Sequence, residues 1–248
     1  MDQKFYQEYY KLEREGWWFK ARLSILENYC KNMITNPDMK ILNVGAATGA
    51  TSEMLSKYGK VTSLEYDEFC CKFLKEKTGI EAVNASLTQL PFKNNSYDII
   101  CAFDVIEHIE DDKKAVEEIR RVLKPKGKYF LTVPAFQSLW SNHDVVNHHY
   151  RRYKRKPFNK LIENTNLKID YSTYFNFWLF IPISLMRFIL NNITRKKDSN
   201  SSGSDNEIMQ SSNIINWILY RIFYSEKFLL RLNIKFPFGV SILTIGYK

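Results

Sequence analysis

Small residues and one acid stand where this chain could hold a nucleoside. Residues 40–55, KILNVGAATGATSEML, read as an apolar strand, a turn with Gly45, Ala46 and Gly49, and the start of a helix. Backbone N–H groups at such a turn bind polar ligands, and Gly45 allows a close approach. Roughly twenty residues later comes Glu65, where a carboxylate could accept hydrogen bonds from a ribose diol. Together these features predict a nucleoside ligand, although the small residues alone would also suit an empty tight turn.

A second group of reactive side chains lies in residues 138–156, SLWSNHDVVNHHYRRYKRK. Imidazole can take a proton from a hydroxyl group near neutral pH, and guanidinium groups bind phosphate or carboxylate. We predict an acceptor site here, with His143 and His149 as candidate catalytic bases. Its expected members are His143, Asp144, His149, Arg151, Arg152 and Tyr153. A solvated basic surface, a phospholipid contact and a divalent metal held by the histidines are the alternatives, and we expect no metal site.

The elements that position these residues follow a βαβ pattern. Strand-like apolar runs alternate with helical stretches from residue 40 to about 134, as in a parallel sheet. One helix is expected from Asp111 or Asp112, its N-cap, to a stop at Pro125 and Gly127, and residues 3–33 are expected to be helical. The expected strands are Lys40–Val44, Val61–Tyr66, Glu81–Asn84, Tyr97–Phe103, Gly127–Val133, Lys168–Phe175 and Ser241–Tyr247.

Two apolar segments lie between the last two expected strands. The first, FNFWLFIPISLMRFILNNI, is interrupted by Asn176, Pro182 and Arg187, whereas a membrane-spanning helix needs about 20 mostly apolar residues. The second, IINWILYRIFYSEKFLLRL, contains interspersed basic residues. Helices that lie on an anionic membrane show this mixture, and a lid packed on the main domain is the alternative. The polar stretch between them predicts a flexible loop over about residues 195–212.

Composition limits the partners and the compartment. The formal net charge of +9 favours an anionic partner, which a phosphorylated ligand, an anionic membrane or a nucleic acid would provide. The four cysteines lack C-x-x-C spacing, which favours reduced thiols over a disulfide framework or a zinc site. The charged N-terminal residues lack the apolar run of a signal peptide. We therefore expect a cytoplasmic protein, with peripheral contact to an anionic membrane as an option.

Four stretches carry a resemblance to a known family. They are ILNVGAATG, SLEYD, LPFKNNSYDIICAFDVIEHIEDD and RVLKPKGKYFLTVP. In this order and spacing they resemble the class I S-adenosylmethionine-dependent methyltransferases. A narrower similarity, through WWFKAR, the segment 133–153 and PFGVSIL, is to bacterial UbiG/UbiE-like members of the methyltransferase type 11 group. The strong match covers residues 40–134, and the flanks match more weakly.

The resemblance implies S-adenosylmethionine as the cofactor and assigns residues to it. The methionine end would lie against Asn43, Gly45, Ala46 and Gly49, the ribose against Glu65 and Tyr66, and the adenine against Ser86 and Leu87. Phe103, Asp104 and His108 would lie beside the sulfonium, and Trp18 and Arg22 would close over the cofactor. Two positions depart from the family pattern. Asn43 replaces an acid, which would weaken cofactor binding without abolishing it. Ala47 replaces a glycine, and the only cost expected is the space that its methyl group occupies.

From the residues alone, these positions also have interpretations without a ligand. Asp104, Glu107 and His108 would form a solvated acidic turn, and Trp18 would be a core residue. The resemblance implies an α/β fold: a Rossmann-like, doubly wound, seven-stranded, mostly parallel sheet with an antiparallel last strand. We expect one domain, with an N-terminal helical cap (1–36), a core (37–175), a helical lid or membrane-contacting insertion (176–237) and the last strand (238–248).

The expected function is methyl transfer from S-adenosylmethionine to oxygen of a small or lipid-linked acceptor. An RNA or protein methyltransferase is a second possibility, but nucleic acid is the less favoured partner because the basic residues are interleaved with long apolar runs. A third is a non-catalytic cofactor-binding or membrane-adaptor protein. The sequence leaves the oligomeric state open.

Overall fold

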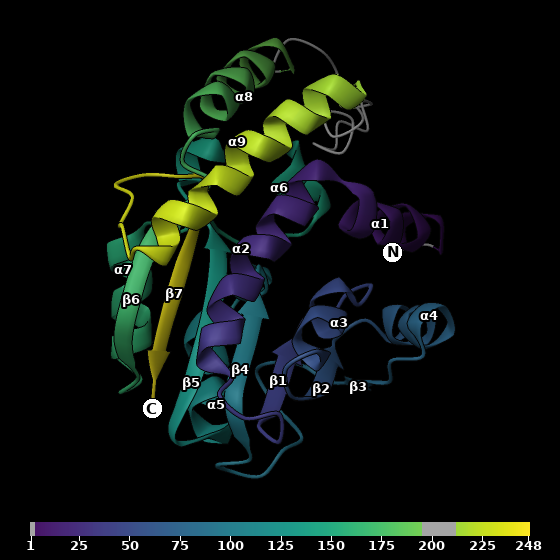
Figure 1. Cartoon of the computed structure of the whole chain (residues 1–248), viewed down its shortest axis with the longest axis vertical. Coiled ribbons are helices and arrows are strands. Elements are labelled where there is room, and N and C mark those ends of the chain that lie inside the picture. Colours follow the sequence, from purple (N-terminus) through teal and green to yellow (C-terminus); the bar gives the residue numbers. More distant parts are fainter. Residues whose placement is uncertain (1–2, 195–211) are drawn as a thin grey trace.

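A seven-stranded sheet in the order β3-β2-β1-β4-β5-β7-β6 forms the centre of the computed structural model (Figure 1). The structure describes residues 3–194 and 212–248, so the loop expected at 195–212 lies almost wholly outside the described residues. The strands are β1 Lys40–Val44, β2 Lys60–Glu65, β3 Ala82–Asn84, β4 Tyr97–Phe103, β5 Leu123–Pro134, β6 Lys168–Phe175 and β7 Ser241–Tyr247. Neighbouring strands from β3 to β5 are parallel, and β7 is antiparallel to both β5 and β6. The expected fold class is confirmed.

Helices cover both faces of this sheet. They are α1 Gln3–Glu15, α2 Trp17–Met33, α3 Ala50–Ser56, α4 Glu68–Thr78, α5 Asp112–Val122, α6 Asn142–Val146, α7 Arg155–Glu163, α8 Phe180–Thr194 and α9 Asn213–Arg231. Helix α2 and the sheet share a core that includes Ile25, Leu26 and Phe130. Helices α5 and α7 pack on the opposite face (Figure 1). None of the described helices has the length and hydropathy needed to cross a bilayer.

Two expected elements differ from the structure. The N-terminal helix is two helices, because Gly16 has extended backbone angles (φ −63°, ψ 129°) that end α1 and begin α2. The predicted stop at Pro125 and Gly127 is wrong: α5 ends at Val122, and the chain passes directly into β5 at Leu123. Proline is accommodated there near the start of the strand. Helices α6 and α7 were not anticipated.

The predicted N-cap of α5 is correct. The Asp111 carboxylate accepts a hydrogen bond from the Lys114 backbone N–H at 2.9 Å. This bond satisfies one of the free N–H groups at the start of a helix. It also fixes the chain that follows β4, where several of the predicted site residues lie.

Candidate functional site

The turn after β1 has the backbone shape that its small residues predict. Gly45 and Gly49 have positive φ angles of 70° and 102°. A Cβ atom on Gly45 would lie 2.5 Å from Val105 Cγ2, and one on Gly49 would lie 2.6 Å from Leu74 Cδ1, so a side chain at either position would have to displace a neighbouring side chain. Ala47 also has a positive φ of 45°, and the cost of Ala47 is therefore backbone strain as well as the room for a methyl group.

Glu65 ties the end of β2 to this turn. Its Oε2 accepts a hydrogen bond from Ala47 N at 2.9 Å, and its Oε1 accepts from Tyr66 N at 2.8 Å and from Asp67 N at 3.1 Å. A carboxylate has about four acceptor positions, so Oε2 can accept one more hydrogen bond. Glu65 is therefore placed where the sequence predicts it, beside the turn and with an acceptor position left for a ligand hydroxyl.

Asn43 lies behind the turn and is fully buried. Its Nδ2 donates to Thr51 Oγ1 at 2.9 Å and to Ser52 Oγ at 2.8 Å, and Ser52 is bonded in turn to Ser63. Its Oδ1 is buried and has no hydrogen-bond partner among the described residues. The side chain thus joins β1 to α3, and its oxygen is the atom left over for a ligand or a water molecule.

Helix α1 closes over the outer side of the turn (Figure 1). Thr48 Oγ1 donates a hydrogen bond to the Glu13 carboxylate. Arg14 Nη2 donates to Thr48 O at 3.1 Å and pairs with Glu53 at 2.6 Å. Burial raises the pKa of Glu13 to about 7. Sequence reasoning missed Glu13 and Arg14 because no motif includes them; the one available signal was Gly16, which breaks the helix.

Arg22 and Asp104 meet at the carboxyl end of β4. Arg22 Nη2 lies 2.7 Å from Asp104 Oδ2, and Thr132 Oγ1 donates to Asp104 Oδ1 at 2.9 Å. The Arg22 guanidinium also lies 5.5 Å from the Trp18 ring and 5.9 Å from the Phe103 ring. The structure therefore brings together all four of these predicted residues. Thr132, on β5, was missed because a strand threonine carries no signal of its own.

The other predicted cofactor residues are placed more loosely. Tyr66 is 76% exposed and is free to lie along a ribose. Ser86 Oγ is bonded to Thr88 Oγ1 at 2.8 Å, which shapes the loop after β3. Leu87 is buried in the core, so only its backbone is available to an adenine. His108 lies beside His149, with the two ring centroids 4.4 Å apart.

Asp144 organises the predicted acceptor site. This fully buried carboxylate lies 2.8 Å from His149 Nδ1, accepts from Arg152 Nε at 2.7 Å and accepts from Ser141 N at 2.8 Å. Burial alone would raise the pKa of Asp144, but the hydrogen bonds from His149 and Arg152 hold it well below its usual range. Asp144 thereby fixes the orientation of the His149 ring, which is the arrangement of a base and its orienting acid.

Two other predicted acceptor residues are already engaged. Arg151 pairs with Asp112 at 2.9 Å and donates to Glu110 O, and Tyr153 OH donates to the same Asp112 carboxylate at 2.8 Å. These contacts attach the segment after β5 to the start of α5. The predicted base His143 lies near His149, with 6.3 Å between the two ring centroids.

Glu107, His108 and His149 form a group that could hold a divalent cation. One potential ligand atom from each lies within 4.8 Å of the others. Both carboxyl oxygens of the buried Glu107 lack a hydrogen-bond partner among the described residues. Burial, together with the nearby charge of Asp104, raises the pKa of Glu107 well above its usual range. From the sequence, a divalent metal held by the histidines is only an alternative and no metal site is expected; Glu107 is not linked to His149 because the two residues come from distant segments.

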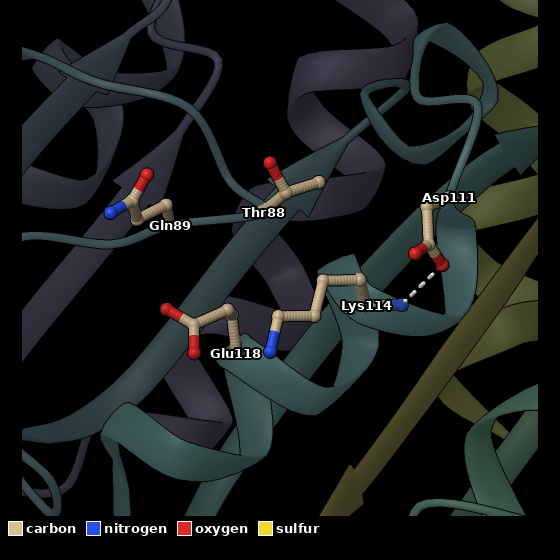
Figure 2. Close-up of a pocket in the computed structure, with 5 residues that line it drawn as sticks. All are labelled: Thr88, Gln89, Asp111, Lys114 and Glu118. Carbon is tan, nitrogen blue, oxygen red and sulfur yellow. Dashed lines mark hydrogen bonds between the residues drawn. The ribbon is translucent and has the colours of Figure 1, made fainter.

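A shallow hollow of about 540 Å³ lies beside α5 (Figure 2). It is lined by Thr88, Gln89, Asp111, Lys114 and Glu118. The Asp111 carboxylate caps α5, and Glu118 accepts hydrogen bonds from Arg121 and from Leu90 N. Because both acids are used by the fold, we place the candidate site at the turn instead.

A family model matches the central part of the chain. Residues 42–131 match the family model described as a methyltransferase domain. This range begins in β1 and ends within β5, so it contains the glycine turn, Glu65 and Asp104. The match and the sheet order together identify a class I S-adenosylmethionine-dependent methyltransferase domain.

Curated relatives match part of the chain. A glycine/sarcosine/dimethylglycine N-methyltransferase from Actinopolyspora halophila is 33% identical over 108 residues, which are 40% of this chain and 19% of that protein. The ubiquinone/menaquinone biosynthesis C-methyltransferase UbiE from Wigglesworthia glossinidia brevipalpis is 29% identical over 133 residues, 48% of this chain and 52% of that protein. The chain thus spans about half or less of the length of these relatives.

A solved structure matches the fold over most of the chain. The geranyl diphosphate C-methyltransferase from Streptomyces coelicolor, solved with Mg²⁺, geranyl diphosphate and S-adenosyl-L-homocysteine, has a TM-score of 0.58. The match covers 90% of this chain and 80% of that one at 12% sequence identity. At this identity the likeness concerns the fold alone.

Proposed function

We propose that this chain, which carries a class I S-adenosylmethionine-dependent methyltransferase domain, transfers a methyl group to oxygen of a small or lipid-linked acceptor. The observation that carries the proposal is the meeting of three features at the carboxyl ends of β1, β2 and β4: the glycine turn, Glu65 and the Arg22–Asp104 pair. Ligands of open α/β sheets bind at this edge. S-adenosylmethionine would supply an electrophilic methyl group on its sulfonium.

The residues present fit this cofactor. The tight turn depends on Gly45, which has a positive φ of 70° and where a Cβ atom would lie 2.5 Å from Val105 Cγ2. Glu65 retains an acceptor position on Oε2 for a ribose hydroxyl, and Tyr66 is exposed beside it. Asn43 contributes a neutral oxygen where the family pattern has an acid, so we propose weaker but sufficient binding of the methionine end.

For the acceptor, we propose that His149 removes the proton of a hydroxyl group while Asp144 holds its ring. In-line methyl transfer depends mainly on positioning, and a base is needed only when the acceptor must lose a proton. The names of the two relatives describe methylation of nitrogen and of carbon. The proposal that oxygen accepts the methyl group therefore depends on the His149–Asp144 pair alone. The exposed apolar surface of α8 and α9 supports a lipid-linked acceptor.

The first experiment is isothermal titration with S-adenosylhomocysteine. We expect micromolar binding that Glu65→Ala reduces at least about tenfold, because a hydrogen bond to a charged acceptor contributes roughly 1.5–3 kcal/mol. Glu68→Ala is the matched control, since the Glu68 side chain is exposed and bonded only to Lys72 at the surface. Absence of binding in the wild-type chain would refute the proposal.

The second experiment follows the methyl group. The chain is incubated with methyl-labelled S-adenosylmethionine and a bacterial lipid extract, and the product is analysed by NMR for a methoxy signal. We expect His149→Ala to lower the rate at saturating cofactor without changing S-adenosylhomocysteine affinity. A C-methyl or N-methyl product would overturn the assignment to oxygen, and cofactor binding without any product would favour a non-catalytic role.

A further inference from the structure

Exposed apolar side chains concentrate on one part of the molecule. Of the eighteen large hydrophobic side chains that are exposed among the described residues, thirteen lie between Trp178 and Ile234. This segment contains α8, at the top of the molecule in Figure 1, and α9, which runs from the top down across α2. Monomeric proteins rarely leave such a concentration exposed to water, and larger patches mark interaction sites.

On α8 the exposed apolar residues form a single stripe. Ile181, Leu185, Phe188 and Ile189 are between 47% and 68% exposed and follow the spacing i, i+4, i+7, i+8. Residues with this spacing share one face of a helix. Another part of the same helix is attached to the domain: Arg187 is buried and donates to Leu139 O at 2.5 Å.

Helix α9 is apolar on two sides. Its inner side packs on the domain through Phe223, whose ring centroid is 6.2 Å from that of Trp18, and through Leu230, whose carbonyl accepts from Tyr29 OH at 3.1 Å. Its outer side carries another apolar row at helical spacing, Ile214, Ile218, Ile222, Phe228 and Leu232, all of them exposed. A helix that merely covered the core would be polar on this side.

The exposed charges in the described part of this segment have one sign. Arg221, Arg231 and Lys235 are exposed and Lys227 is half-buried, whereas Glu226 is the sole acid between residues 176 and 240 of the described chain and is fully buried. Exposed tryptophans accompany the cations: the Arg221 guanidinium lies 5.8 Å from the Trp217 ring centroid. Tryptophan and basic residues are the anchors that proteins place at the boundary between lipid and water.

We propose that the outer faces of α8 and α9 dock on the surface of an anionic lipid bilayer. The apolar rows enter the boundary between headgroups and acyl chains, and the cations of α9 and Lys235 contact the lipid phosphates. The inner faces stay packed on the domain, so the segment is both a cover for the core and a membrane contact. This inference rests on the surface alone and does not require the proposed methyl transfer.

The test is flotation of the full chain with vesicles. We expect the chain to float with vesicles of phosphatidylcholine containing about 30% phosphatidylglycerol and to stay behind with pure phosphatidylcholine. The double variant Phe188→Ser/Trp217→Ser is expected to lower the partition coefficient about tenfold or more, since two large anchors are lost. Tyr66→Ser is the matched control, because Tyr66 is the most exposed large hydrophobic residue outside the segment, at 76%.

A second pair of variants tests the charges. Arg221→Ser/Arg231→Ser and the control Lys72→Ser/Lys75→Ser each remove two positive charges, but the control lysines lie exposed on α4. Only the first pair is expected to weaken flotation with anionic vesicles. Equal effects of both pairs would indicate attraction by net charge and would overturn the proposal.

Two further outcomes would overturn it. One is an absence of flotation by the wild-type chain. The other is a concentration-dependent dimer, measured by light scattering, that Phe188→Ser/Trp217→Ser dissociates, because the face would then bind a second copy. Circular dichroism of each variant checks that it is folded, and the substituted side chains are exposed and should not affect folding.

Discussion

Replacing Asp104 by Asn should destabilise the chain far more than a comparable change at the surface. Arg22 is nearly buried, with 8% of its side chain exposed, and its ion pair with Asp104 is 2.7 Å long. Its Nε has no hydrogen-bond partner among the described residues. Asn keeps an amide oxygen that can accept from Arg22 Nη2 but carries no charge, so the guanidinium loses its ion pair; its other hydrogen bond is a weak one to Thr132 Oγ1 at 3.4 Å.

The expected magnitude follows from this burial. Removing one partner of a buried ion pair costs about 3–5 kcal/mol, and the partial exposure of Asp104 places the expectation at about 3 kcal/mol. Asn also tolerates the positive φ of 58° at position 104, so the substitution tests the charge and not the backbone. For the exposed pair of Lys72 with Glu68, Glu68→Gln should cost about 0.5 kcal/mol or less.

Urea denaturation at pH 7 measures both variants. With about 3 kcal/mol per M of urea for a chain of this size, Asp104→Asn should lower the midpoint by about 1 M. Adding Arg22→Met to Asp104→Asn should recover part of the loss, because the unpaired charge is removed. Equal midpoints for Asp104→Asn and Glu68→Gln, or no recovery in the double variant, would refute the reasoning.

Three other predictions concern positions around the site and the insertion. Ala47→Gly should stabilise the chain by about 0.5–1 kcal/mol because it removes a left-handed alanine, whereas Ala50→Gly in α3 should destabilise it in the same denaturation assay. Asn43→Ala should cost about 2–3 kcal/mol because two buried hydrogen bonds are lost, and a cost equal to that of the exposed Asn84→Ala would contradict this. Burial raises the pKa of Glu226 from 4.5 to about 7, so the folded state favours the protonated side chain. The resulting contribution to the free energy of unfolding is complete below pH 4.5 and is lost as the pH rises through 7. Glu226→Gln should therefore reduce the loss of stability between pH 4.5 and 7, by roughly 3 kcal/mol at most. If the melting temperature of the variant fell with pH as steeply as that of the wild-type chain, the assignment would be contradicted.

The sheet could be predicted from sequence because its signals are local. Each strand is a short β-branched or aromatic run, and the glycine turn and Glu65 have fixed places relative to β1 and β2. The break at Gly16 was missed because an isolated glycine in a helical pattern is often tolerated. The contacts of Arg151 and Tyr153 with Asp112 were missed for a different reason: whether an exposed-looking basic run is free or paired depends on tertiary structure.

Helix α2 connects the two surfaces that were inferred separately. Its first turns carry Trp18 and Arg22 toward the site, and Ser24 and Tyr29 bind α9 through Lys227 and the Leu230 carbonyl. An insertion that served only as a movable lid would not need hydrogen bonds along the length of a core helix. These bonds instead fix α9 relative to the site while its outer face stays exposed. A bilayer held by that face would therefore lie at a constant distance from Asp104, which is the geometry that an acceptor carried on a lipid requires.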